Sequence, residues 1–256
     1  MSPADSVIRD KPCAMSLSHQ ILDHLSAVER ERVARRNEPG LNASVLAVKR
    51  FQQLRFRHTY ADLLTSVRYR PAATFFLEEL YGPDDFSRRD AQFARVVPAI
   101  GRLFSAEVVA TVALLSELHS LSEQLDTSMG RALMGAQVNA KGYVAAWPAS
   151  GTPLQRSKQI DLTLEVASSL EGLTRRALLR NSLRLMRRPA QVAGLGELQR
   201  LLERGFDTFK AMNGAQSFIS LIDVRERILA SALFAAYSCD APSKQLDVFT
   251  LLPALV

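Results

Sequence analysis

Apolar residues recur at three- and four-residue spacing along most of the chain, which is the spacing of an amphipathic α-helix. In residues 195–212, leucine and phenylalanine occupy one face of the helical wheel, and acidic residues and lysine occupy the other. The alternation of apolar and polar residues that marks a β-strand extends over only a few positions anywhere in the sequence. The pattern predicts an all-α protein, a multi-helix bundle of about eight to ten helices.

Breaks in this pattern divide the chain into predicted helices. Most breaks contain proline, glycine or asparagine, the residues that end helices and form turns. The predicted helices cover residues 16–36, 44–64, 71–81, 86–104, 105–136, 154–172, 174–187, 195–212 and 215–237.

The same breaks suggest how the chain is organised. Residues 1–15 are expected to form a disordered N-terminal tail, and Met15 offers an alternative start of translation. Residues 16–239 form the predicted helical domain, with a candidate sub-boundary at the proline- and glycine-containing linker 147–153. Residues 240–256 form a C-terminal tail whose apolar end is expected to dock on the domain.

Composition narrows the class of protein. The chain has 256 residues, 47% of them hydrophobic, which is enough for one sizeable core or two smaller ones. Cys13 and Cys239 lie far apart and outside any C-x-x-C motif, which is typical of a reduced cytoplasmic protein. The best apolar run, at 108–115, is shorter than the roughly 18 residues of a membrane span. We therefore expect a cytoplasmic protein that is not an integral membrane protein.

Basic residues are concentrated in one segment. The formal net charge is +6, and residues 172–196 contain six arginines but neither aspartate nor glutamate. Five of these arginines share one face of a predicted helix. Such a face binds nucleic-acid phosphates or an anionic membrane surface, or it pairs with acidic residues of neighbouring helices or of a second subunit. These candidate anion-binding residues are Arg176, Arg180, Arg184, Arg187 and Arg188.

Four other charges fall on, or at the margin of, predicted apolar helix faces. An unpaired buried ion costs on the order of several kcal/mol. Glu79 and Arg89 flank a single turn, so an ion pair between them is sterically reasonable, and Arg225 and Glu226 could extend it. The four residues form either a structural ion-pair network or a polar pocket. In the pocket, Arg89 or Arg225 would bind an anionic ligand and Glu79 would accept a proton.

Sequence motifs for common cofactors and catalytic sites are missing. His119 lies on an apolar face two turns before Asp126 and is interpreted as a core or semi-core histidine satisfied by a neighbour. The sequence has no phosphate-binding loop, dinucleotide fingerprint, G-x-S-x-G motif or metal-binding histidine pair. It therefore predicts no metal site and no cofactor, and it identifies no catalytic residue.

One segment carries a family resemblance. The string FFLEELY at residues 75–81, followed by Gly82-Pro83 and by Arg88-Arg89-Asp90, resembles the signature of bacterial FFLEELY-motif proteins. Similarity is expected from about Ser44 to Ala236. The resemblance implies a bacterial cytoplasmic protein of helical build, and it implies no reaction, cofactor or catalytic residue.

Three functions remain open at this point. The sequence favours an interaction or regulatory module without catalysis of its own, which binds a protein partner or a second copy of the chain. The first alternative is an enzyme or small-ligand binder that uses a buried cluster of Glu79, Arg89 and Arg225. The second is a nucleic-acid or anionic-surface binder that uses the face from Arg176 to Arg188.

Overall fold

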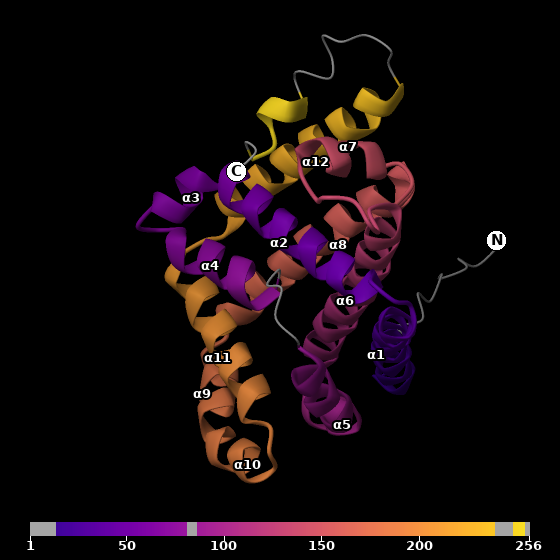
Figure 1. Cartoon of the computed structure of the whole chain (residues 1–256). Helices are drawn as coiled ribbons and strands as arrows, with labels where there is room; N and C mark the ends of the chain where they lie inside the picture. The colour runs from indigo at the N-terminus through magenta and orange to yellow at the C-terminus, as the bar shows by residue number, and fades with distance from the viewer. Residues whose placement is uncertain (1–13, 81–85, 239–247, 254–256) are drawn as a thin grey trace, which may run out of the picture.

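The structure, a computed structural model, describes residues 14–80, 86–238 and 248–253 (Figure 1). Every regular element in these residues is a helix, so the predicted all-α fold is confirmed. Four of the thirteen described segments have six residues or fewer. The other nine agree with the predicted eight to ten helices. The segments are α1 (Ala14–Asn37), α2 (Leu41–Thr59), α3 (Ala61–Thr65), α4 (Arg70–Phe75), the π-helical η1 (Phe76–Leu80), α5 (Ser87–Leu103), α6 (Ala106–Ala132), α7 (Ala140–Ala146), α8 (Pro153–Thr174), α9 (Ala177–Leu185), α10 (Arg187–Val192), α11 (Gly196–Ala211) and α12 (Gln216–Ser238).

Three local features differ from the predicted helices. The short helix α7 was not predicted, and the predicted helix 71–81 changes from α to π geometry at Phe76. The predicted helix 174–187 is divided into α9 and α10 at Met186. Pro189 explains this division, because its ring would clash with the carbonyl of Leu185 in a continuous helix.

The predicted tails fall largely outside the described residues. Residues 1–13 of the N-terminal tail are not described, whereas Ala14 and Met15 belong to α1. Residues 239–247 and 254–256 are likewise not described. Between them, Val248 and Leu252 are buried in a core cluster with residues of α2, α6, α7 and α12.

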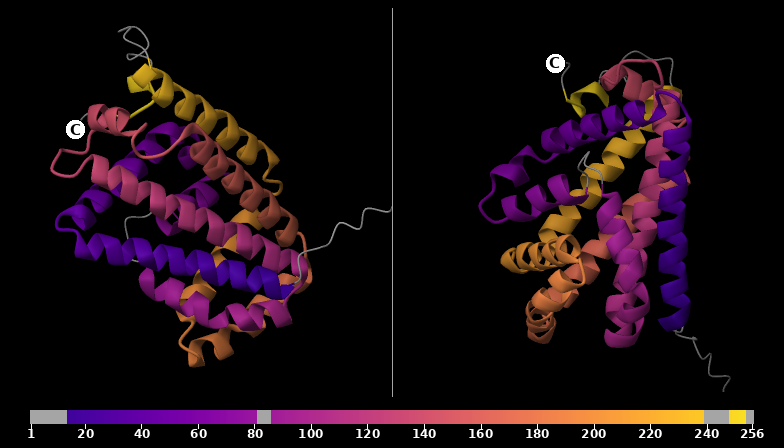
Figure 2. Two further views of the ribbon diagram at one scale, coloured as in Figure 1. Left: turned by 90° about the vertical axis from the view of Figure 1, so that its right-hand side faces the viewer. Right: turned by 60° about the horizontal axis from the view of Figure 1, so that its bottom comes forward.

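The helices form a bundle from which one arm extends. Helix α6 packs against α1, α2 and α8, and α8 also packs against α12. Figure 2 shows α1 running alongside both α5 and α6. On the other side of the molecule, α9, α10 and α11 form an arm that ends at α10 (Figure 1).

Two larger hydrophobic clusters are joined by shared helices. The first contains Val48 and Phe51 of α2 together with Leu229, Leu233 and Ala236 of α12. The second contains Phe56 of α2 together with Phe76, Phe209 and Phe218. The centroid of the Phe76 ring lies 5.9 Å from that of Phe209 and 5.9 Å from that of Phe218. Because α2 and α12 contribute to both clusters, the two halves of the bundle pack as neighbours along common helices.

Helices α2 and α6 approach closely at Gly130. A Cβ atom at this position would lie 2.5 Å from Cγ2 of Val45, closer than real Cβ contacts. The Ser44 hydroxyl donates a hydrogen bond to the Gly130 carbonyl over 2.7 Å. The missing side chain therefore permits a contact that brings the polar residues of the two helices within reach of each other.

Candidate functional site

A partly enclosed cavity of about 220 Å³ lies inside the bundle. Helices α2, α5, α6, α8, α11 and α12 all contribute to its lining. Most of the wall is apolar, and its aromatic and aliphatic side chains include Phe76, Phe86, Phe93, Leu115, Ile160 and Leu201.

One wall of the cavity is polar. Four residues of α6 line it at positions i, i+3, i+4 and i+7: His119, Ser122, Glu123 and Asp126. With a rise of about 1.5 Å per residue, this stripe extends over about 10 Å of the helix. A ligand in the cavity would therefore meet apolar side chains on most sides and a row of polar groups on one.

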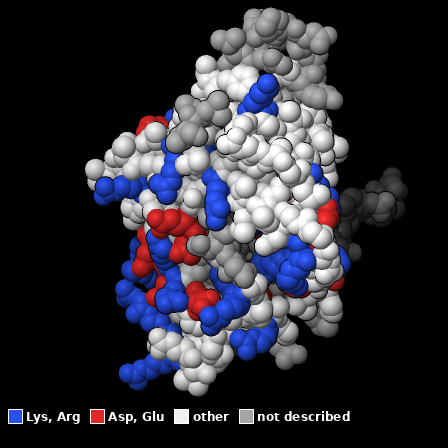
Figure 3. Space-filling view, viewed as in Figure 1, with Lys and Arg blue, Asp and Glu red and all other residues white. Residues whose placement is uncertain are grey.

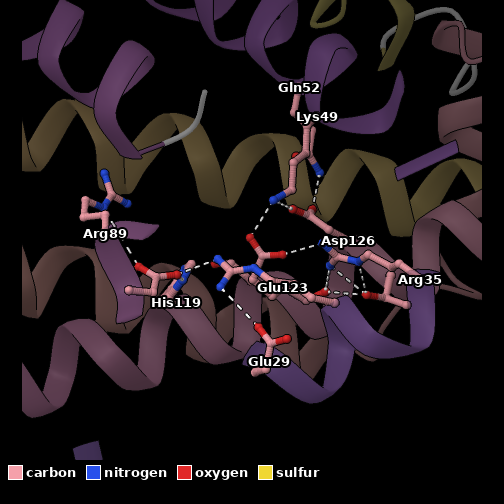
Figure 4. A network of polar contacts seen from close by, with 12 residues as sticks. Glu29, Arg35, Lys49, Gln52, Arg89, His119, Glu123 and Asp126 are labelled. Carbon is pink, nitrogen blue, oxygen red and sulfur yellow. Dashed lines mark hydrogen bonds and ion pairs between the residues drawn. The ribbon is translucent and has the colours of Figure 1, made fainter. Parts of the chain in front are cut away.

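Glu123 is the centre of a buried charge network between α1, α2 and α6 (Figure 4). Its carboxylate accepts hydrogen bonds from Lys49 Nζ over 2.5 Å and from Arg35 Nη1 over 2.6 Å. Arg35 is only 6% exposed and also bonds the hydroxyl of Thr127. Burial alone raises the pKa of Glu123, but the charges of Lys49 and Arg35 outweigh it and lower the pKa from 4.5 to about 2.

The pKa of Asp126, one helical turn further along α6, is shifted in the opposite direction to that of Glu123. Burial raises the pKa of Asp126, and the charge of Lys49, whose Nζ lies 3.9 Å away, only partly offsets that rise. The neighbouring charge of Glu123 raises the pKa further, and Gln52 donates a hydrogen bond to Asp126 over 3.0 Å. One carboxylate of the pair is thus held ionised, while the other takes up a proton more readily.

A second part of the network joins α1, α5 and α6. Asp90 Oδ2 lies 2.5 Å from Arg32 Nη2 and 2.9 Å from His119 Nε2. Burial raises the pKa of Asp90, but the hydrogen bond and charge of His119, together with Arg32, lower it overall. The hydrogen-bond partner of His119 is thus Asp90 of α5, and not Asp126 of its own helix.

Arg89 presents a part-buried guanidinium to the cavity. Its side chain is 14% exposed, and its Nη1 donates a hydrogen bond over 2.9 Å to the backbone carbonyl of Glu79. The guanidinium carbon lies 4.0 Å from the ring centroid of Phe86. Among the described residues, Asp90 supplies the carboxylate that lies within 4 Å of Arg89, with its Oδ1 3.9 Å from Arg89 Nε. That carboxylate already binds Arg32 and His119. Burial lowers the pKa of Arg89, and the charges of Asp90 and Glu79 oppose this shift.

The predicted side-chain pair between Glu79 and Arg89 is not formed. Arg89 binds the carbonyl of Glu79, whereas the Glu79 carboxylate binds Arg204 of α11, which also pairs with Glu78. The π geometry of η1 (Phe76–Leu80) is the reason, because its wider turn rotates each residue less than the α-helical wheel assumes. The direct ion pair that the sequence made sterically reasonable is therefore not formed, and the Arg89 side chain is part-buried.

Arg225 and Glu226 join different partners. Arg225 forms a two-bond pair with Asp62, over 2.7 and 2.8 Å, on a partly exposed surface. Glu226 accepts hydrogen bonds from Arg55 and from the Tyr60 hydroxyl. Of the four charges predicted to cluster, the structure brings two to the cavity wall, and these are Arg89 and Glu226.

The five candidate anion-binding arginines do not share one helix face. Arg176 precedes α9, Arg180 and Arg184 belong to α9, and Arg187 and Arg188 belong to α10. Basic and acidic side chains interleave over the lower left of the face shown in Figure 3. Three of the five arginines pair with carboxylates of other helices, as one of the two interpretations of this segment expected. The pairs are Arg176 with Glu107, Arg180 with Asp207 and Arg187 with Glu203.

Two further features are absent from the described parts of the chain. No group of three histidine, cysteine, aspartate or glutamate side chains there is arranged to hold a metal ion. None of the described helices combines the length and the apolar character needed to cross a membrane.

Fold and cavity together define an all-α protein with an internal, partly polar cavity. Residues 31–239 match the family model of a domain of unknown function, DUF8198, and the chain belongs to this family. The matched residues include Arg89, His119 and Glu123, and so cover the polar wall of the cavity. Searches of curated proteins and of solved structures gave no match.

Proposed function

We propose that this protein is a cytoplasmic ligand-binding module and that its internal cavity takes a small amphipathic anion. In this proposal the ligand regulates the protein, and no reaction is catalysed. The observation that carries the proposal is Arg89, a part-buried cation in a mostly apolar cavity, whose nearest carboxylate among the described residues, Asp90, is already bound by two other groups.

The cavity volume limits the ligand size. An apolar cavity of about 150 Å³ is known to hold benzene, so a cavity of this volume suits a ligand of roughly nine non-hydrogen atoms. Because most of the wall is apolar and Arg89 lines it, a ligand with one charged end and an apolar body suits the lining better than a compact polar molecule. A medium-chain carboxylate such as octanoate has this form.

The charges around the cavity favour an anion over a cation. Lys49 and Arg35 both pair with Glu123, and Arg55 is paired with Glu226. Within the described residues, the hydrogen bond of Arg89 to the Glu79 carbonyl leaves other guanidinium donors for a carboxylate or phosphate. Such charge-assisted hydrogen bonds are roughly twice as strong as neutral ones. The apolar part of the ligand would contact residues such as Phe93.

Calorimetric titration with three probes of equal chain length tests the proposal. Octanoate, octanol and octylammonium share an apolar body and differ in the charge of the head group. We expect octanoate to bind more tightly than octanol, and octylammonium to bind most weakly. Arg89→Met should weaken octanoate binding about ten- to hundredfold and leave octanol binding nearly unchanged, since one hydrogen bond to a charged group contributes about 1.5–3 kcal/mol.

Arg88→Met is the matched control, because Arg88 is the preceding residue of α5 and its side chain is 81% exposed. It should leave the affinity for both octanoate and octanol unchanged. Arg89→Lys retains the charge and a donor for the Glu79 carbonyl, so it separates loss of charge from loss of local structure. Failure of all three probes to bind the folded wild-type protein, or an equal loss of octanoate and octanol affinity in Arg89→Met, would contradict the proposal.

A second variant tests the place of binding. Ala230 lines the cavity from α12, and a phenylalanine there would fill part of it. Ala230→Phe should therefore weaken octanoate and octanol alike, in contrast to Arg89→Met. Unchanged affinity for both probes, in a protein whose circular dichroism remains helical, would place the binding site elsewhere.

A further inference from the structure

The arm formed by α9, α10 and α11 ends in large apolar side chains that are open to solvent. Val192 is 91% exposed, Leu185 is 79% exposed and Met186 is 42% exposed. All three lie at the turn between α9 and α10 or at the end of α10, which Figure 1 shows at the far end of the arm. We refer to residues 184–192 as the arm tip.

The arm tip is also positively charged. Arg184 and Arg188 are exposed, and no carboxylate of the described residues forms an ion pair with either of them. The nearby acidic residues Glu203 and Asp207 are bound by other arginines, Arg187 and Arg180. Because residues 172–196 contain no aspartate or glutamate, nothing in the local sequence neutralises the two tip arginines.

We infer that the arm tip docks on an anionic lipid surface. Leu185, Met186 and Val192 would enter the boundary between head groups and acyl chains, and Arg184 and Arg188 would bind lipid phosphates. This inference rests on the arm alone and is independent of a ligand in the cavity.

The same features argue against a nucleic acid as the partner. Proteins that bind single strands supply aromatic side chains on which bases stack, and residues 184–192 contain none. The exposed apolar side chains would remain in water against a phosphate backbone, whereas a lipid surface removes them from water. Charge and apolar exposure at one projecting tip therefore favour lipid.

Vesicle co-sedimentation of the full chain tests the inference. The probes are phosphatidylcholine vesicles with and without phosphatidylglycerol, and poly(A) RNA in a parallel filter-binding assay. We expect binding to the vesicles that contain phosphatidylglycerol, with weaker binding as salt is added. Each of Arg184→Gln and Arg188→Gln should lower vesicle affinity about fivefold, which corresponds to the roughly 1 kcal/mol contributed by one basic residue at an anionic membrane.

Leu185→Ser and Val192→Ser should each lower the same affinity about tenfold, because each removes an apolar side chain that would leave water. Val67→Ser and Arg57→Gln are the matched controls. Val67 is 89% exposed and Arg57 is exposed near the end of α2, and both substitutions should leave vesicle binding unchanged.

Three results would overturn the inference. The first is equal binding to both kinds of vesicle, or to neither. The second is vesicle binding that the tip substitutions leave unchanged. The third is RNA binding that is tighter than vesicle binding and depends on Arg184 and Arg188 but not on Leu185 and Val192.

Discussion

Glu123→Gln removes the central charge of the buried network and keeps the size of the side chain. The pKa of Glu123 falls from 4.5 to about 2 on folding, which corresponds to about 3 kcal/mol of stabilisation near neutral pH. Breaking a buried ion pair on one side typically costs about 3–5 kcal/mol. We expect the lower end of this range, because Arg35 keeps its bonds to Thr127 and to the Glu123 backbone carbonyl.

Denaturant-induced unfolding near neutral pH measures this cost. The control is Glu117→Gln on the same helix, where the Glu117 side chain is 30% exposed and pairs with Lys158 at 56% exposure. A pair of this kind contributes about 1 kcal/mol or less. We therefore expect the two substitutions to differ by at least about 2 kcal/mol in the free energy of unfolding.

The pH dependence gives a second check. Because the folded-state pKa of Glu123 lies below the unfolded value, its contribution is complete above pH 4.5 and is lost as pH falls towards about 2. The difference in stability between wild type and Glu123→Gln should shrink over this window, because the wild type loses the contribution of the ionised Glu123 carboxylate as that group takes up a proton. Equal costs for the two glutamine variants, or a difference that stays constant as the solution is acidified, would refute the reasoning.

Two other substitutions test packing and the limits of the site. Gly130→Ala should destabilise the protein by about 1–3 kcal/mol, because its Cβ would lie 2.5 Å from Val45 Cγ2. Gly172→Ala, in an open part of α8, should be neutral or should stabilise the protein by up to about 1 kcal/mol. Equal free energies of unfolding for the two variants in denaturant would contradict this expectation. Arg225→Gln should change the free energy of unfolding by about 1 kcal/mol or less, because its ion pair with Asp62 is partly exposed. It should leave octanoate affinity unchanged in calorimetry, since Arg225 lies outside the cavity lining. A loss of octanoate affinity as large as that of Arg89→Met would show that the site extends further.

The helices were predictable because their signal is local. Apolar spacing over 15 to 25 residues placed segments such as α8, α11 and α12 within about two residues of their observed ends. The seven-residue helix α7 is too short to show two periods of that spacing, and its start depends on an Asn139 side chain that accepts a bond from the Gly142 amide. The π turn of η1 was missed because the helical wheel assumes a constant rotation per residue.

The polar network was not predictable from single helices because its bonds are long-range. Arg35 and Glu123 are 88 residues apart in the sequence, and Lys49 and Glu123 are 74 apart. A local signal did exist, in the three- and four-residue spacing of polar residues along an otherwise apolar helix. These residues of α6 are Ser116, His119, Ser120, Glu123, Asp126 and Thr127.

Arg89 links the cavity to the end of η1. The same guanidinium that lines the cavity donates to the backbone carbonyl of Glu79, and the carboxylate of Glu79 pairs with Arg204 of α11, one of the helices of the arm. A ligand that moved Arg89 away from η1 would weaken the bond to that carbonyl, and a firmer bond there would then oppose binding in the cavity. If the proposed ligand moves Arg89 in this way, occupancy of the interior and the attachment of the arm are thermodynamically linked through one side chain.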